Sequence, residues 1–165
     1  MKSIGIVMGS KSDLPVVQKA IDTLKEYGIP YEVHILSAHR TPVEAAEFAK
    51  TARERGFAAI IAFAGMAAHL AGAIAANTTL PVIGVPCAGS NLSGLDALLS
   101  TVQMPSGIPV ATVAVGGGAN AAVLAAQILA VEDAALAQRL TAQRSAMADK
   151  IFKQDRELQQ ELNQA

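Results

Sequence analysis

The stretch YEVHILSAHRTPVE, residues 31–44, decides the fold because an extended run turns into a helix within it. Its first six residues are rich in aromatic, β-branched and aliphatic side chains, which predicts a strand. Thr41 is a favoured N-cap residue, Pro42 suits the first helical position, and Glu44 stands three residues after the cap, which predicts a capping box. The polar residues between these two elements therefore follow the carboxyl end of a strand and precede the amino end of a helix.

The same strand-then-helix pattern repeats on both sides of this stretch. Apolar runs predict strands at residues 4–8, 31–36, 58–64, 81–85 and 110–115, and helices are expected between them, among others at residues 42–55 and 92–102. Short continuous apolar runs are typical of strands buried on both faces of a parallel sheet. The alternation predicts an α/β fold in three layers, a doubly wound, five-stranded parallel sheet.

The C-terminal segment has a different pattern. Three apolar pairs recur every eleven residues, at Leu136 and Leu140, Met147 and Ile151, and Leu158 and Leu162. A period of eleven fits a nearly straight helix with a narrow apolar stripe. A helix of about thirty residues is roughly 45 Å long, whereas a domain of this size has a radius of gyration of roughly 15 Å. We expect one domain over residues 1–165, with an α/β core at 1–131 and a helix at 132–165 that packs on a neighbouring subunit.

The composition narrows the class of protein. The chain has 165 residues, of which 52% are hydrophobic, and a net charge of −1, so its overall field favours neither nucleic acid nor a membrane surface as a partner. No apolar run is long enough to span a bilayer, and the first residues lead directly into a strand, which leaves no room for a signal peptide. The single Cys87 is expected to be a buried apolar side chain. These features predict a cytoplasmic protein.

Polar residues follow three of the predicted strands. Gly9, Ser10, Ser12 and Asp13 come after the first, the Ser-Ala-His-Arg run at 37–40 comes after the second, and His69 lies in a glycine-bounded turn after the third. Ligands bind at this edge of open α/β sheets. Serine hydroxyls and helix N-terminal N–H groups can bind an anion, and Asp13 can accept hydrogen bonds from ribose hydroxyls.

Simpler interpretations remain open for each of these residues. Ser12 can be an N-cap with Asp13 as a favourable first-turn charge, and His39 and Arg40 can face water. His34 lies inside a strand and is expected to be structural. The three histidines share no spacing typical of metal ligands, so no metal site is predicted.

Taken together, the motifs resemble those of the class I N5-carboxyaminoimidazole ribonucleotide mutases of purine biosynthesis. The matching segments are GSKSD at 9–13, SAHRTP at 37–42, GMAAHL at 65–70, GVP at 84–86, GLDALLS at 94–100 and VQMP at 102–105. The resemblance covers essentially the whole chain. It implies a three-layer, flavodoxin-like α/β fold, commonly a homo-octamer in which the C-terminal helix reaches a neighbour, and a reaction without ATP, metal or organic cofactor.

The resemblance also implies roles for individual residues. Ser10 and Arg40 would hold the phosphate of the ribonucleotide, and Asp13 its ribose. His39 would be the general acid–base, while Ser37 and His69 would help to position CO2 and the imidazole ring of the substrate. The other residues expected to bind substrate are Gly9, Ser12, Ala38, Gly65, Ala67, Ala68 and Leu70.

Two positions depart from the family pattern. Ala71 stands where proline is usual, and Met66 stands where a smaller residue is usual. We expect the loss of proline at Ala71 to change the order of the loop, and the larger side chain of Met66 to narrow the CO2 side of the pocket. The alternatives are the class II relative, which carboxylates aminoimidazole ribonucleotide directly with CO2, and a non-catalytic nucleotide- or flavin-binding module on the same fold.

Overall fold

The computed structural model describes residues 2–89 and 91–163 and contains the predicted five-stranded parallel sheet. The strands are β1 (Ser3–Met8), β2 (Tyr31–Ile35), β3 (Phe57–Gly65), β4 (Val82–Cys87) and β5 (Ala111–Thr112), in the spatial order β2-β1-β3-β4-β5. Every neighbouring pair is parallel. The chain reverses direction across the sheet after β2, which leaves β1 and β3 adjacent at the centre. The predicted α/β class is confirmed.

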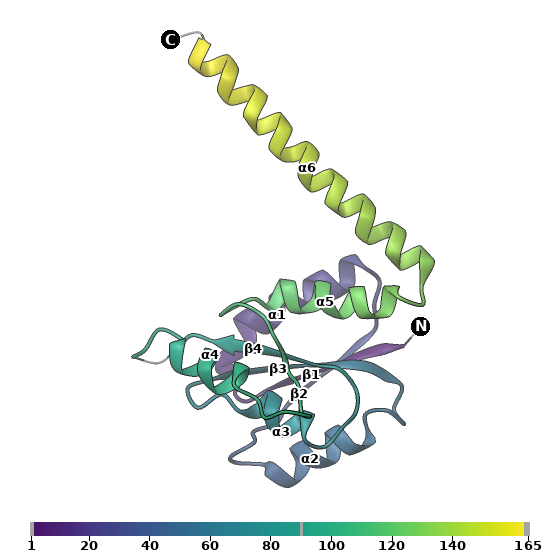
Figure 1. The fold of residues 1–165 in the computed structure, drawn as a ribbon, viewed down its shortest axis with the longest axis vertical. Helices are drawn as coiled ribbons and strands as arrows, with labels where there is room; N and C mark the ends of the chain where they lie inside the picture. The colour runs from purple at the N-terminus through teal and green to yellow at the C-terminus, as the bar shows by residue number, and fades with distance from the viewer. Residues whose placement is uncertain (1, 90, 164–165) are drawn as a thin grey trace. The chain divides into compact units, whose positions relative to one another are not determined.

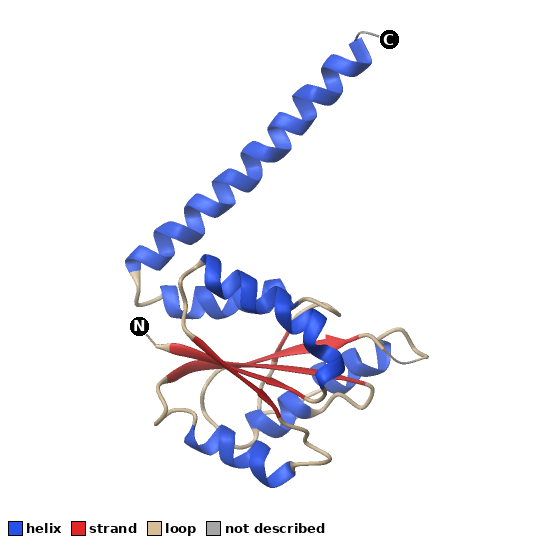
Figure 2. Ribbon diagram, turned by 180° about the vertical axis from the view of Figure 1, so that it is seen from behind, coloured by secondary structure: helices blue, strands red, loops and turns tan. Residues whose placement is uncertain are grey.

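Helices cover both faces of the sheet. The helical elements of this part of the chain are the 3-10 turn η1 (Lys11–Asp13) and the α-helices α1 (Leu14–Glu26), α2 (Pro42–Thr51), α3 (Leu70–Ala75), α4 (Leu95–Val102) and α5 (Gly118–Ala130). A last helix, α6 (Ala134–Asn163), follows them in the sequence. Figures 1 and 2 show α1 and α5 on one face and α2 and α3 on the other, which gives the three predicted layers. The central strands are buried on both faces, as continuous apolar runs require.

The fifth strand and two of the helices are clearly shorter in the structure than predicted. The fifth strand covers Ala111–Thr112 rather than residues 110–115, although the chain stays beside β4 through bonds from Val113 N to Gly84 O and from Gly116 N to Pro86 O. Helix α4 begins at Leu95 rather than at residue 92, because Ser93 and Gly94 adopt left-handed φ angles of 53° and 89° that no α-helix contains. Helix α2 ends at Thr51 rather than at residue 55.

The chain divides into two compact units, Met1–Leu129 and Ala130–Ala165. The second contains α6, a single helix of 30 residues, close to the length that its sequence pattern predicts. Its distal apolar side chains are at least half exposed: Met147, Ile151, Leu158 and Leu162. The prediction that these residues pack on a neighbouring subunit stays a prediction, as does the single-domain organisation.

Cys87 ends β4 and is 2% exposed, so the predicted buried role is confirmed. Burial, together with the negative charge of Asp13, raises the pKa of the Cys87 thiol to about 12. Across residues 2–89 and 91–163, no helix combines the length and apolarity that a membrane crossing needs.

Candidate active site

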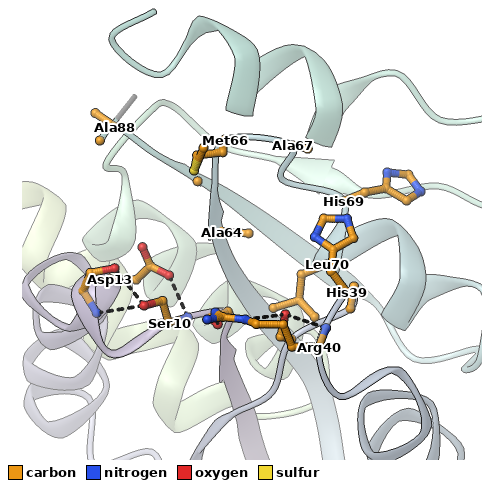
Figure 3. Close-up of a pocket in the computed structure, with 16 residues that line it drawn as sticks. Ser10, Asp13, His39, Arg40, Ala64, Met66, Ala67, His69, Leu70 and Ala88 are labelled. Atoms are coloured by element: carbon orange, nitrogen blue, oxygen red, sulfur yellow. Dashed lines mark hydrogen bonds between the residues drawn. The ribbon is translucent and has the colours of Figure 1, made fainter. Parts of the chain in front are cut away.

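A pocket of about 690 Å³ lies at the carboxyl ends of the strands, within the first unit. Loops after β1, β2, β3 and β4 all contribute to it. Its lining consists of Gly9, Ser10, Ser12, Asp13, Ser37, Ala38, His39, Arg40, Ala64, Gly65, Met66, Ala67, His69, Leu70, Ala88 and Gly89. In the view of Figure 3, Ser10 and Asp13 lie on the left and the imidazole rings of His39 and His69 on the right.

The loop after β1 contains a capping box, formed by Ser10 and Asp13, at the amino end of η1. Ser10 Oγ accepts hydrogen bonds from the backbone N of Ser12 at 3.3 Å and from Ser12 Oγ at 2.9 Å, and Asp13 Oδ2 accepts one from Ser10 N at 3.2 Å. Ser10, and not Ser12, is therefore the N-cap. Burial raises the pKa of the Asp13 carboxyl, while the Ser10 N–H and the charge of Arg40 act in the opposite direction. The loop presents two hydroxyls and one half-buried carboxylate to the pocket.

The His39 loop (residues 37–41) follows β2 and is closed by its own side chains. Thr41 Oγ1 accepts a hydrogen bond from Ser37 N at 2.8 Å and donates one to Ser37 O at 3.2 Å. Thr41 is the N-cap residue of α2 and Pro42 the first helical residue, as predicted, but the predicted capping box with Glu44 is wrong, because Thr41 makes no side-chain cap bond. Its hydroxyl is occupied by Ser37. The structure thus uses this threonine to fix the loop rather than the helix end.

Arg40 connects the His39 loop to the loop after β1. Its Nη2 donates a 2.8 Å hydrogen bond to the backbone oxygen of Gly9, and its backbone N donates to Ser37 Oγ at 3.2 Å. In Figure 3 the side chain reaches from the right side of the pocket toward Ser10. A guanidinium carries five N–H donors, so further donors remain for an anion in the pocket. His39, the residue before it, is exposed.

The His69 turn (residues 65–69) begins at Gly65, the last residue of β3. Two tight backbone bonds shape it, from Ala68 N to Met66 O and from His69 N to Ala67 O, both at 2.8 Å. Met66 has a φ of 57°, in the left-handed region, and its side chain is 67% exposed. The His69 imidazole is exposed, and its Nδ1 lies 3.0 Å from the backbone oxygen of Ser100 in α4.

The structure brings the predicted site residues together, with one exception. Ala68 does not line the pocket; it is 1% exposed, and its backbone oxygen accepts a hydrogen bond from Thr101. Sequence reasoning missed Ala64, Ala88 and Gly89. Ala64 lies near the end of β3, and Ala88 and Gly89 follow β4. That position is the signal that was available, since the other pocket residues lie at the same edge of the sheet.

His34 lies outside the pocket lining, as its place inside a strand predicted. Its Nε2 is 2.5 Å from Glu32 Oε1, which also accepts a hydrogen bond from Arg55. Its ring stacks at an angle on Phe48, with 5.3 Å between the ring centres. This cluster stabilises the edge strand β2. Within the described residues, no three His, Cys, Asp or Glu side chains lie close enough together to hold a metal ion.

Comparisons with known proteins assign the family. The family model described as AIR carboxylase matches residues 3–150, which is most of the chain. The chain belongs to the AIR carboxylase family. Among curated AIR carboxylase relatives, "N5-carboxyaminoimidazole ribonucleotide mutase" of Pyrococcus horikoshii is 53% identical over 157 residues, covering 95% of this chain and 89% of the relative. The protein of the same name from Thermotoga maritima is 50% identical and covers 97% of this chain and 94% of the relative.

The fold of this chain is also seen in a solved structure. The crystal structure of Treponema denticola PurE has a TM-score of 0.85 with this chain at 32% sequence identity, covering 94% of this chain and 97% of that one. The agreement in fold therefore extends over nearly the full length of both chains. The mutase relatives share more of the sequence than this structural relative does.

Proposed function

We infer that this AIR carboxylase family member is an N5-carboxyaminoimidazole ribonucleotide mutase, an isomerase of purine biosynthesis. It converts N5-carboxyaminoimidazole ribonucleotide to 4-carboxy-5-aminoimidazole ribonucleotide. The observation that carries this conclusion is the identity of about half of all residues to curated proteins of that name over almost the entire chain. The pocket supports it, because groups suited to a phosphate, a ribose and a proton transfer line one cavity.

We propose that the ribonucleotide end of the substrate lies against the loop after β1. The hydroxyls of Ser10 and Ser12 and the guanidinium of Arg40 supply donors for the phosphate. Asp13 carries negative charge, so it is matched to ribose hydroxyls rather than to the phosphate. The bond from Arg40 to Gly9 O holds the guanidinium over this loop before substrate arrives.

The reaction then takes place at the other end of the pocket, between His39 and His69. The bond between the nitrogen and the carboxylate carbon breaks and releases CO2, and the nitrogen takes up one proton to become a neutral amino group. C4 of the ring then attacks the CO2, and the C4 proton leaves. One proton is gained and one is lost, so a single acid–base group balances the reaction. His39 fits this role, since an imidazole both donates and accepts protons near neutral pH. Ser37 and His69 help to hold the CO2.

The sequence of steps changes no oxidation state and consumes no phosphate bond. We therefore propose that the enzyme needs no ATP, metal or organic cofactor. CO2 is small and apolar, so a pocket that retains it should be lined by small side chains and backbone. Gly65, Ala67 and Ala64, all at the end of β3 or just beyond it, provide such a lining.

We also propose that the protein self-associates, as a homo-octamer, and acts in the cytoplasm. Exposed leucine, isoleucine and methionine side chains recur along α6, and a second exposed row lies on α4, at Leu95, Leu99 and Val102. Apolar surface of this extent is typical of protein interfaces. The native mass should fall when Ile151 and Leu158 are both replaced by glutamate, and should stay unchanged with Gln154→Glu. An unchanged mass in the first variant would contradict the assignment of α6 to the interface.

The test of the function is an assay without metal, ATP or added bicarbonate. N5-carboxyaminoimidazole ribonucleotide is supplied, and the C4-carboxylated product is followed by ultraviolet absorbance. We expect turnover by the wild type and a loss of about 10²–10⁴-fold in His39→Asn, the usual contribution of positioned acid–base catalysis, with nucleotide binding retained. Carboxylation of the unmodified ribonucleotide only when bicarbonate is present would assign the class II reaction instead.

A further inference from the structure

The His69 turn is held by residues more than thirty positions away in the chain. His69 Nδ1 lies 3.0 Å from the backbone oxygen of Ser100, and Thr101 Oγ1 lies 3.0 Å from the backbone oxygen of Ala68. Two adjacent residues of the turn are therefore tied to two adjacent residues at the end of α4.

Thr101 is fixed on its other side as well. It is 2% exposed, and its hydroxyl also lies 2.7 Å from the backbone oxygen of Ala97, so it shares one proton between two carbonyl groups. Its methyl group rests on Gly84 of β4, where an added Cβ would come within 2.4 Å of Thr101 Cγ2. A side chain held by its own helix and by the central sheet provides a rigid anchor for the Ala68 carbonyl.

The contact with Ser100 determines which nitrogen of His69 faces a ligand. A carbonyl oxygen only accepts hydrogen bonds, so Nδ1 must carry a proton. Nε2 is then the nitrogen left for substrate, as an acceptor when the ring is neutral and as a donor when it is protonated. The ring lies against Gly72, where an added Cβ would come within 2.3 Å of Cε1 and 2.5 Å of Nε2. The position of the ring therefore depends on the absence of a side chain at Gly72 and on the position of the turn relative to α4.

We propose that Thr101 is a positioning residue for His69. By holding the Ala68 carbonyl, its hydroxyl fixes the position of the His69 turn at which Nδ1 reaches the Ser100 carbonyl. Nε2 is then the ring nitrogen that this contact leaves available. The inference rests on the proposed function in one respect, namely that His69 helps to hold CO2 and the reacting ring. It adds a residue that lies outside the pocket lining.

Thr101→Val tests the proposal because valine keeps the methyl group on Gly84 and removes the hydroxyl. We expect kcat to fall about tenfold with KM within about threefold, since small misplacements of a reacting group lower turnover more than binding. Thr101→Ser keeps the hydroxyl and should retain kcat within about threefold. Thr112→Val is the matched control, because the Thr112 hydroxyl in β5 is buried and has no hydrogen-bond partner among the described residues. We expect wild-type kinetics for this variant.

A second readout does not depend on turnover. The ¹⁵N chemical shifts of the His69 ring, assigned by comparison with His69→Asn, should show a proton on Nδ1 in the wild type and a mixture of tautomers in Thr101→Val. A wild-type ring protonated on Nε2 would overturn the proposal, as would a Thr101→Val enzyme with unchanged kcat and an unchanged ring.

These readouts separate the two hypotheses. A wild type that does not convert the N-carboxylated ribonucleotide contradicts the proposed function, while the ring ¹⁵N shifts still decide the role of Thr101. If Thr101→Val does not fold, the wild-type tautomer and the kinetics of Thr101→Ser decide it. Loss of turnover in Thr101→Ser with a wild-type ring would overturn the proposal, because the methyl packing and not the hydroxyl would then matter.

Discussion

The His39 loop and the His69 turn each bring a histidine to the same pocket, but they are held in different ways. The His39 loop is closed within itself, by Thr41 and Ser37, with one further bond from Arg40 to Gly9. The His69 turn is held from a distance, by the end of α4. The first arrangement depends on a few consecutive residues, whereas the second depends on how α4 packs on the sheet. Changes in α4 should therefore affect one histidine and leave the other in place.

The largest effect is expected from breaking the local loop. Thr41→Val removes both hydrogen bonds to Ser37 and leaves the Ser37 N–H without that partner, which costs about 1–3 kcal/mol of stability for a buried group and less for this half-buried one. The loop carries His39, so kcat/KM should fall about 100-fold. Steady-state kinetics and urea unfolding measure the two effects. Thr41→Ser, which keeps the hydroxyl, should remain within a few-fold of the wild type.

The double variant Thr41→Val with Thr101→Val sharpens the comparison. If the two histidines are held independently, the losses in ln(kcat/KM) should add. A double variant no worse than Thr41→Val alone would mean that the loop and the turn act as one unit, contrary to their independent anchoring.

A smaller effect concerns the backbone of the His69 turn. Met66 has a left-handed φ of 57°, a conformation that costs a side-chain-bearing residue roughly 1–2 kcal/mol. Met66→Gly removes this cost. Glycine also loses more conformational freedom on folding than methionine does, which lowers the free energy of unfolding by roughly 0.5–1 kcal/mol. We expect a net gain of about 0.5–1 kcal/mol in the free energy of unfolding, measured in urea. The control Ala67→Gly, at a position without a left-handed φ, should lose stability; equal losses in both variants would contradict the strain.

The smallest effect is expected in β2, the strand that precedes the His39 loop in the sequence. The hydrogen bond from His34, with help from Arg55, holds the pKa of the Glu32 carboxyl below its ordinary value of 4.5. A lowered pKa in the folded state contributes stability that is present above pH 4.5 and is lost as the pH falls through the folded value. The Glu32 side chain is 44% exposed, so solvent screens this interaction and its contribution should be about 0–1 kcal/mol.

Glu32→Gln isolates that contribution. The difference in the free energy of unfolding between wild type and variant should be largest near neutral pH and should shrink below pH 4.5. The raised pKa of Asp13 affects both proteins equally and cancels in the difference. A difference that grows as the pH falls would contradict a lowered pKa for Glu32 in the folded state.

The local features of the chain were readable from sequence because neighbouring residues decide them. The apolar runs that became β1, β3 and β4 and the Thr41-Pro42 start of α2 are of this kind. The capping box was predicted wrongly, because the Thr41 hydroxyl has two possible bonding partners and the sequence does not indicate which of them it bonds. Ser37, four residues earlier, competes for the hydroxyl with the first turn of the helix.

The distant contacts were outside the reach of sequence reasoning. Nothing in the spacing of His69 and Ser100 indicates that they meet, because the contact depends on how α3 and α4 pack beside β4. The burial of Ala68 has the same origin: its neighbours in the sequence line the pocket, yet Thr101 holds its carbonyl away from that pocket. The start of α4 after Gly94 was missed because two left-handed residues precede it, and only one of them is a glycine.

The burial of Cys87 has a practical consequence for studying the protein. It is the only thiol in the chain, and with a pKa of about 12 and 2% exposure it offers alkylating reagents almost no thiolate at neutral pH. A cysteine introduced at an exposed position, such as Gln159 on α6, would be the only one to react. The wild-type chain is thus already a background-free scaffold for attaching a fluorophore or a spin label to α6.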